Sequence, residues 1–285
     1  MRALVIARLV IREAARRRLL LALLALTLLV IALTGWGFSR IPTIVQRGAP
    51  LTELQVKLIS SQFLILTMFM FSFVLALSAV FIASPTVSGE VESGIALALL
   101  SRPLGRAEYI VGKWLGLAAL VIVYAGGAAA IELGVVNAVV GYAPPEPLAF
   151  IGFIVVEGVA IMTFALLLST RLSGMVGGVI ALVLFGIAWI GGVVGGIGAA
   201  FDNATILHVG TVTKLVLPTD GLWRGAVYAL EPQALLATGA QAGPAIAANP
   251  FYAATALPLA YEAYVVVWIA GLLALAVVSF NAREP

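Results

Sequence analysis

The sequence alternates between long apolar segments and short polar links. Of its 285 residues, 62% are hydrophobic and only 10% are charged, which leaves too little polar surface for a soluble protein of this size. A helix needs about 20 mostly apolar residues to cross the hydrocarbon core of a bilayer. Segments of about this length occur at residues 19–38, 62–83, 114–140, 148–169, 175–197 and 259–280. We therefore predict an all-α integral membrane protein with six transmembrane helices in one domain, residues 1–285.

Residues 1–18 have the pattern of a basic amphipathic helix. Arginines occupy one half of the helical wheel, and alanine, leucine, valine and isoleucine occupy the other. Such a helix lies at the surface of an anionic leaflet, so membrane lipid is an expected partner. A signal peptide is the alternative interpretation. Five further spans and the lack of a clear small-residue cleavage site argue against it.

Residues 84–113 form a polar interruption between the second and third spans. Ser84 or Ser88 is suited to cap a helix, Pro85 to its first turn, and Pro103 to its end. The acidic residues expected near the positive start of this helix are Glu90 and Glu92. One face of the helix contains Ile95, Leu99 and Arg102. The pattern predicts a short amphipathic helix outside the membrane, and its apolar face needs a partner.

This segment resembles the first cytoplasmic loop of type-2 ABC transporter permeases. The residues that carry the resemblance are Glu92-Ser93-Gly94, Leu99-Leu100-Ser101-Arg102-Pro103, Arg106 and Gly112-Lys113. The resemblance implies a coupling helix that docks on a separate ATP-binding subunit. The implied docking residues are Glu92, Ser93, Gly94, Ile95, Leu99, Leu100, Arg102 and Pro103; Ile95 departs from the family, which often has threonine there. The other interpretation is an interfacial helix that only joins two spans. A second segment, 217–224, is similar to one before the last span in part of the family.

Residue types that commonly build active sites in soluble proteins are scarce. The chain has no cysteine and one histidine, His208, which excludes disulfides, thiolate metal sites and histidine clusters. His208 and Asp202 supply only two of the ligands that a zinc site needs, so we expect no metal. The chain lacks the G-x-x-x-x-G-K-[ST] motif of a P-loop. We therefore expect no enzymatic activity, no cofactor and no nucleic-acid partner; ATP would be bound by the partner subunit.

The distribution of basic residues predicts the orientation. With the N-terminus inside, eleven of the lysines and arginines fall on the inner side and five on the outer side. Cytoplasmic loops carry the excess of these residues. We therefore expect a multi-pass protein of the cell membrane with both termini in the cytoplasm, which also places residues 84–113 inside.

The fifth span is rich in glycine. Gly191 with Gly195, and Gly192 with Gly196, form two small-xxx-small pairs, which allow helix backbones to approach closely in lipid. One interpretation is packing within one subunit. The other is a seam between two permease chains, as a homodimer or pseudo-dimer, because the resembling family acts as a dimer with its fifth and first spans at the seam.

Two carboxylates lie within predicted spans, Glu132 in the third and Glu157 in the fourth. A charged group at that depth costs about 2.5 to 3.5 kcal/mol on the insertion scale, and no lysine or arginine occupies a span core. Each carboxylate is therefore expected to be protonated, to bond to Asn137 or a backbone carbonyl, or to face a wet cavity. We expect them to line an outer vestibule or to brace the helices there.

Residues 198–258 are the largest segment on the outer side. Proline punctuates it, and we expect short helices that lie on or dip into the outer leaflet. Asp220 is suited to cap a helix that runs to Leu230. Trp223 and Tyr228 are suited to the membrane interface.

These features together predict a permease subunit of an ABC transporter, with export as the family's direction. A mainly apolar bundle favours an amphiphilic cargo, but the sequence does not identify the substrate. One alternative is an ion- or proton-coupled secondary transporter that uses Glu132 and Glu157. That class predicts internal repeats, and no convincing repeat relates the two halves of the chain. Another alternative is a non-transporting scaffold that recruits a cytoplasmic protein through residues 84–113.

Overall fold

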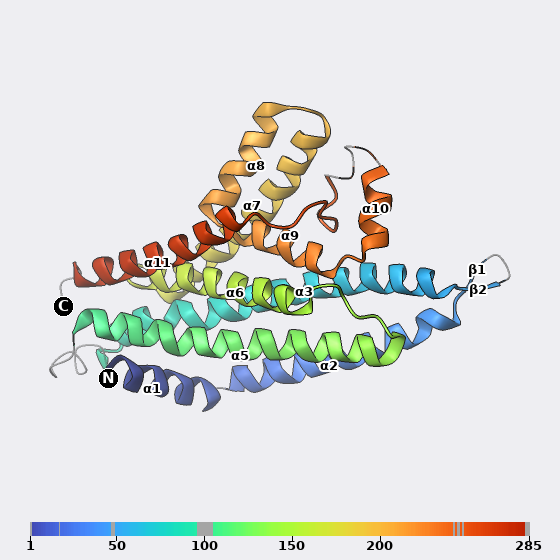
Figure 1. The fold of residues 1–285 in the computed structure, drawn as a ribbon. Coiled ribbons are helices and arrows are strands. Elements are labelled where there is room, and N and C mark those ends of the chain that lie inside the picture. The colour runs from blue at the N-terminus through green and yellow to red at the C-terminus, as the bar shows by residue number, and fades with distance from the viewer. Residues whose placement is uncertain are drawn as a thin grey trace.

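The computed structural model describes residues 2–16, 18–46, 49–95, 105–241, 243, 246 and 248–282 (Figure 1). The helices are α1 (Arg2–Arg16), α2 (Arg18–Arg40), α3 (Glu53–Glu92), α5 (Arg106–Val140), α6 (Pro147–Ser169), α7 (Gly174–Ala200), α8 (Ala204–Val216), α9 (Thr219–Leu230), α10 (Gln233–Gln241) and α11 (Leu259–Asn281). A 3-10 turn, η1 (Ile41–Thr43), and two antiparallel strands, β1 (Val45–Gln46) and β2 (Ala49–Pro50), join α2 to α3.

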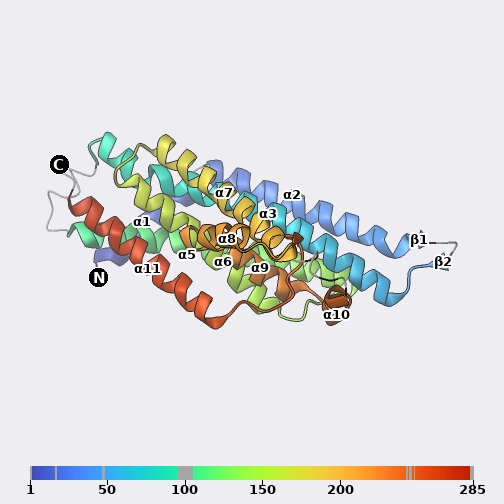
Figure 2. The same cartoon turned by 90° about the horizontal axis from the view of Figure 1, so that it is seen from above.

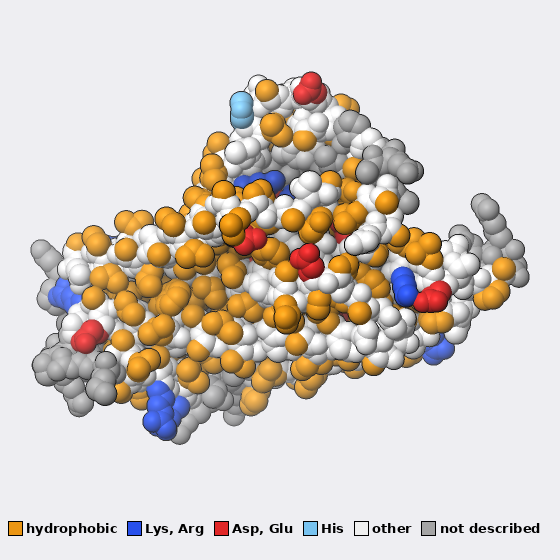
Figure 3. Space-filling view, in the orientation of Figure 1, with side chains coloured by type: hydrophobic (Ala, Val, Ile, Leu, Met, Phe, Trp, Pro, Cys, Tyr) orange, Lys and Arg blue, Asp and Glu red, His pale blue; other side chains and the backbone are white. Residues whose placement is uncertain are grey.

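Six helices in the described part of the chain are long and apolar enough to cross a membrane: α2 continued through η1, α3, α5, α6, α7 and α11. Each predicted span lies inside one of them. The predicted all-α membrane fold with six spans is therefore confirmed. Lysine, arginine and acidic side chains gather at the two ends of the bundle and beneath the α7–α8 hairpin, whereas hydrophobic side chains cover much of its length (Figure 3).

Two helices are much longer than the spans predicted within them. α3 has 40 residues and α5 has 35, which corresponds to lengths of roughly 60 Å and 52 Å at about 1.5 Å per residue. The hydrocarbon core is only about 30 Å thick, so both helices extend beyond it. The end of α3 and the start of α5 lie at the same end of the bundle as the two termini (Figure 1). We call this the inner end.

The prediction that a new helix starts at Ser84 or Ser88 is wrong, because Pro85 lies inside α3. Proline removes one backbone donor, but it does not end the helix where the surrounding packing holds the chain. Pro85 packs closely against Gly174 at the start of α7, where an added Cβ would lie 3.0 Å from the Cα atom of Pro85. Thr86 Oγ1 also donates to the carbonyl of Ile82 at 2.6 Å. α3 therefore continues to Glu92.

The N-terminal helix α1 packs along the first part of α5. Its small side chains Ala7, Val10 and Ala14 are buried. A Cβ at Gly112 or Gly116 of α5 would lie within 2.8 Å of α1 atoms, so these glycines allow the close approach. The predicted helix is present, and its position on a lipid leaflet stays a prediction.

The core lies where α3, α5, α6 and α9 pack together. Phe69 of α3 contacts Phe73, Trp189, Trp223 and Phe251, with ring centroids 4.9 to 5.4 Å apart. α7 and α8 form a hairpin that leans away from the rest of the bundle (Figures 1 and 2). α9 returns the chain to the bundle, and nearly all of its residues are buried. Within the segment 198–258, α9 is therefore an integral part of the fold, whereas most residues of α8 are exposed.

Candidate functional site

The loop at the inner end joins the C-terminus of α3 to the N-terminus of α5. Four of the predicted docking residues, Leu99, Leu100, Arg102 and Pro103, lie outside the described residues. Of the other four, Glu92 is the last residue of α3, and Ser93, Gly94 and Ile95 follow it. Gly94 has a φ of +76°, a left-handed conformation that glycine adopts without steric cost. The Ile95 side chain is 51% exposed, as a docking residue requires.

A charged cluster links the two helices on either side of this loop. Lys113 of α5 forms an ion pair with Glu90 of α3, and the hydroxyl of Tyr109 donates to the same carboxylate. The Lys113 side chain is only 6% exposed and that of Glu90 is 19% exposed. We call Glu90, Tyr109 and Lys113 the inner cluster. It holds the end of α3 against the start of α5.

The position of Glu90 corrects the sequence interpretation. Glu90 and Glu92 lie in the last turn of α3 and not in the first turn of a new helix. A carboxylate at a helix C-terminus is disfavoured by the helix dipole. Lys113 and Tyr109 offset this cost at Glu90 by supplying a cation and a hydroxyl donor.

A groove lies beside the inner cluster, between α1, α3 and α5. It has a volume of about 270 Å³, and its lining includes Val10, Glu13, Pro85, Glu90, Ile95 and Lys113. Ile95 thus borders both the loop and the groove. Two further contacts hold the C-terminal helix at this end: Arg106 donates to the Asn281 carbonyl at 2.9 Å, and Arg171 donates to Ser279 Oγ at 3.0 Å.

The two carboxylates predicted within the membrane are both buried, but the structure places them against different helices. Glu132 is 2% exposed, and the neighbouring polar side chain is Thr34 of α2. Glu157 is 3% exposed and accepts a hydrogen bond of 2.8 Å from Ser72 of α3. The two therefore do not form a dyad. Among the described residues, no three acidic or histidine side chains cluster as metal ligands.

Glu157 borders a very small cavity where α3, α6, α7 and α9 meet, and the rings of Phe69, Phe73 and Phe185 also line it. The cavity measures about 10 Å³, which is about the size of one water molecule. Its lining includes Glu157, Trp189, Thr219 and Asp220, each with a buried polar atom that lacks a hydrogen-bond partner among the described residues. Buried polar atoms of this kind normally find a partner. These four side chains bring polar atoms to the junction of α6, α7 and α9.

The glycine face of α7 is filled within the chain. An added Cβ would lie 2.2 Å from Thr213 at Gly191, 2.0 Å from the Asp220 carboxylate at Gly192, and 2.9 Å from Gly210 at Gly195. Gly196 is buried as well. α8 and α9 pack on this face within the chain, and the predicted seam between two subunits stays a prediction. The alternative interpretation, packing within one subunit, describes these residues.

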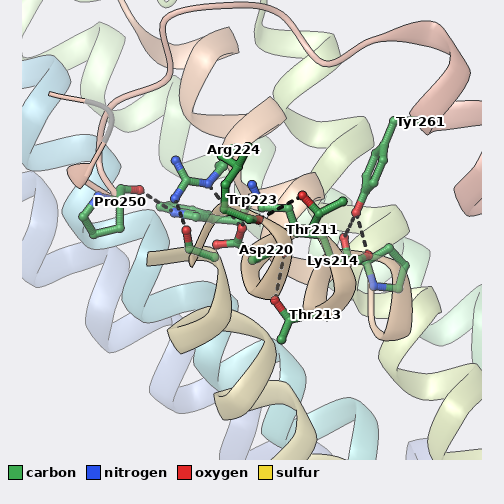
Figure 4. Close-up of polar contacts among 12 residues, drawn as sticks. Thr211, Thr213, Lys214, Asp220, Trp223, Arg224, Pro250 and Tyr261 are labelled. Carbon is green, nitrogen blue, oxygen red and sulfur yellow. Dashed lines mark hydrogen bonds and ion pairs between the residues drawn. The ribbon is translucent and has the colours of Figure 1, made fainter. Parts of the chain in front are cut away.

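A second charged cluster fixes α8 and α9 to that glycine face (Figure 4). Arg224 Nε lies 3.2 Å and Lys214 Nζ 3.7 Å from Oδ2 of Asp220, whose side chain is fully buried. Arg224 Nη2 also donates to the Gly192 carbonyl at 2.9 Å. We call Lys214, Asp220 and Arg224 the outer cluster. Gly192 is required here because any larger residue would occupy the space of the carboxylate.

The outer cluster corrects two predictions about this segment. Asp220 does not cap α9, because Pro218 is the N-cap residue and makes no side-chain cap. Trp223 is 2% exposed and donates to the Pro250 carbonyl at 3.1 Å, so it belongs to the core and not to the membrane interface. The i, i+4 spacing of Asp220 and Arg224 was the available signal, because such a pair on a helix forms an ion pair.

The chain matches the model of a known family. The model of a family described as "ABC-2 family transporter protein" matches residues 4–284. No curated protein matches the chain. The match covers nearly the whole chain, so it includes the inner cluster, the six apolar helices and the outer cluster.

Proposed function

The chain belongs to the ABC-2 family of transporter proteins, and from this premise we propose that it is the permease subunit of an exporter driven by a separate ATP-binding subunit. The partner would bind and hydrolyse ATP, and this chain would form the path through the membrane with its six apolar helices. We further propose that the inner end faces the cytoplasm, and that two permease chains combine with two ATPase chains.

The observation that carries this proposal is the geometry of the inner end. The loop between α3 and α5 is bounded by two helices that extend beyond the hydrocarbon core and that the inner cluster joins. A force on this loop would therefore act on both helices together. α3 packs against α6 and α7, and α5 packs against α1, α2 and α6, so such a force would reach most of the bundle.

The orientation is tested with a single cysteine, because the chain has none of its own. Ile95→Cys places a thiol at the 51% exposed position beside the loop, and Val45→Cys places one at the 64% exposed position in strand β1 at the opposite end. A membrane-impermeant maleimide should label Val45→Cys in intact cells and Ile95→Cys only in inverted vesicles. Labelling of Ile95→Cys from outside the cell would overturn the proposal.

Docking is tested by co-purification with the ATP-binding subunit. Leu99→Asp introduces a charge on the predicted docking face and should abolish the complex. Val45→Asp makes the same chemical change at the opposite end and should leave the complex intact. Equal recovery of the ATPase with both variants would contradict docking at this loop, and ATP-dependent movement of cargo distinguishes a transporter from a scaffold.

The secondary-transporter alternative receives no support from the two membrane carboxylates. A coupled transporter would bring such groups to a shared site, whereas Glu132 faces α2 and Glu157 faces α3.

A further inference from the structure

A pocket of about 300 Å³ opens beside the outer cluster, between the α7–α8 hairpin and the segment that leads into α11. The hollow beneath the hairpin and the basic side chains within it are visible in Figure 3. The lining residues that matter for the argument are Gly196, Thr211, Lys214, Arg224, Ala254 and Ala256. Pockets of this size and larger commonly hold small ligands.

The charge of the pocket is positive. Lys214 and Arg224 both line it, whereas Asp220, the carboxylate that they share, does not. The lining described here contains no acidic residue. Two cations therefore face the pocket with one carboxylate behind them, and the cluster retains one uncompensated positive charge.

Each cation is held in place by contacts behind the pocket wall. Arg224 is fixed by Asp220 and by the Gly192 carbonyl, and its side chain is 17% exposed. Lys214 is 29% exposed and lies 3.7 Å from Asp220. Burial lowers the pKa of Lys214, and the Asp220 carboxylate offsets part of this effect. A second anion at the pocket would therefore stabilise the charged form of Lys214.

The rest of the described lining is mainly apolar, with hydroxyl groups only at Thr211, Tyr252 and Thr255, and it leads to an apolar surface. Ala254 and Ala256 form part of the rim, and Leu207 of α8 is 42% exposed beside it. Val212 and Val216 of α8 are exposed as well, but at 3.6 residues per turn they lie on the side of the helix turned away from Leu207 and Lys214. The site thus combines two cations with an adjoining surface for hydrocarbon, which is the pattern that an anionic amphiphile requires.

We propose that this pocket binds a phosphate-bearing headgroup, with Lys214 and Arg224 contacting the phosphate oxygens and the hydrocarbon part of the ligand lying along α8. Arginine and lysine are the usual phosphate ligands in proteins. The same chemistry is available from a phospholipid or from a soluble phosphate ester. The site does not depend on ATPase docking, so its failure would leave the proposed permease function untouched.

Binding is measured by native mass spectrometry of the purified full chain in nanodiscs of phosphatidylcholine with added phosphatidylglycerol. Phosphatidylglycerol should bind more tightly than phosphatidylcholine. Lys214→Gln should weaken its binding about tenfold, because hydrogen bonds to charged groups contribute at least this factor. Lys57→Gln removes an exposed lysine elsewhere on the chain and should change nothing, whereas Lys214→Arg should retain binding.

A second variant does not alter the charge. Ala256→Trp fills the pocket from its exposed rim and should also reduce binding, while thermal unfolding verifies that the variant is folded. Inorganic phosphate is then added as a competitor. Displacement of the lipid would identify a site that also accepts soluble phosphate esters, and no displacement would identify a lipid site; both support the proposal. Equal phosphatidylglycerol binding by the original chain, Lys214→Gln and Ala256→Trp would overturn it, as would equal binding of the two lipids.

Discussion

The inner and outer clusters use similar residues in different ways. In the inner cluster, one lysine pairs with one carboxylate, and a tyrosine hydroxyl donates to the same group. In the outer cluster, a lysine and an arginine share one fully buried carboxylate. The first arrangement is neutral and joins two helices, as a mechanical link requires. The second leaves a positive charge beside a pocket. Both clusters contain an ion pair, so the ion pair alone does not tell them apart. The balance of charge does: the neutral inner cluster is suited to hold two helices together, and the positively charged outer cluster is suited to bind a ligand.

The largest effect is expected when the central carboxylate of each cluster is neutralised. Asp220→Asn leaves two partly buried cations without their fully buried anion and should cost about 3 to 5 kcal/mol of unfolding free energy. Glu90→Gln leaves a single lysine, Lys113, without its anion; its side chain is 6% exposed, but one cation and not two loses its partner, so the change should cost about 1 to 3 kcal/mol. Thermal unfolding of the purified variants, together with the yield of monodisperse protein, measures both. Equal losses would show that the two clusters do not differ in compensation.

A smaller effect is expected from the helix face that supports the outer cluster. Gly192→Ala forces a Cβ into the space of the Asp220 carboxylate and should cost about 1 to 3 kcal/mol, as overpacking does. Gly186 lies in the same helix, and a Cβ added there meets no atom within 4 Å. Gly186→Ala is therefore the matched control and should be neutral or slightly stabilising. A neutral Gly192→Ala would mean that α8 and α9 adjust freely.

Glu231, which directly follows α9, is another buried carboxylate. No lysine or arginine among the described residues forms an ion pair with it. Burial raises its pKa to about 8, and the N–H of Ala253, 3.3 Å from Oε2, lowers it in part. A carboxyl group whose pKa is raised on folding stabilises the protein below its unfolded pKa, and this stability is lost as the pH rises through the folded value. The protein should therefore lose stability between about pH 5 and pH 8.

Glu231→Gln should remove this pH dependence. At pH 9 the variant should melt a few degrees above the original chain, because it has no buried carboxylate at this position to keep charged. Each kcal/mol gained in unfolding free energy raises the melting temperature by about 2 to 4 °C. At pH 5 the two proteins should melt at nearly the same temperature. Melting curves recorded across this range provide the measurement. A constant difference between the two proteins at all pH values would show that Glu231 does not titrate on folding.

The spans were predictable because hydrophobicity and length alone define a transmembrane helix. The extra length of α3 and α5 was not predictable from hydrophobicity. The polar ends of these helices have the composition of loops, and only their contacts with neighbouring helices explain why they are helical. The sequence predicts a helix start at Pro85 because a proline usually interrupts a helix. The packing against Gly174 explains why Pro85 lies inside α3 instead. A single-helix pattern does not contain that information.

The two clusters show the same limit. Both depend on contacts between residues far apart in sequence or on different helices, such as Glu90 with Lys113 and Arg224 with the carbonyl of Gly192. The glycine pairs of α7 correctly indicated a close helix contact, but small-xxx-small spacing does not identify the helix that makes it. Here that helix is α8 of the same chain. Sequence patterns thus predicted which helix faces pack closely, but they did not predict which helix each face packs against.

The smallest effect is expected from the exposed ion pair of Lys57 and Glu53. This pair serves as the reference against which the effect of burial in the two clusters is measured. These groups lie 2.6 Å apart, four residues apart on α3, with side chains 44% and 83% exposed. Water screens such a pair, so Lys57→Gln should change the melting temperature far less than Glu90→Gln does. Melting in low and high salt measures this and separates screened from buried pairs. If Lys57→Gln destabilised the protein as much as Glu90→Gln, burial would not explain the contribution of the inner cluster to stability. The difference between the inner and the outer cluster would then have to rest on geometry alone.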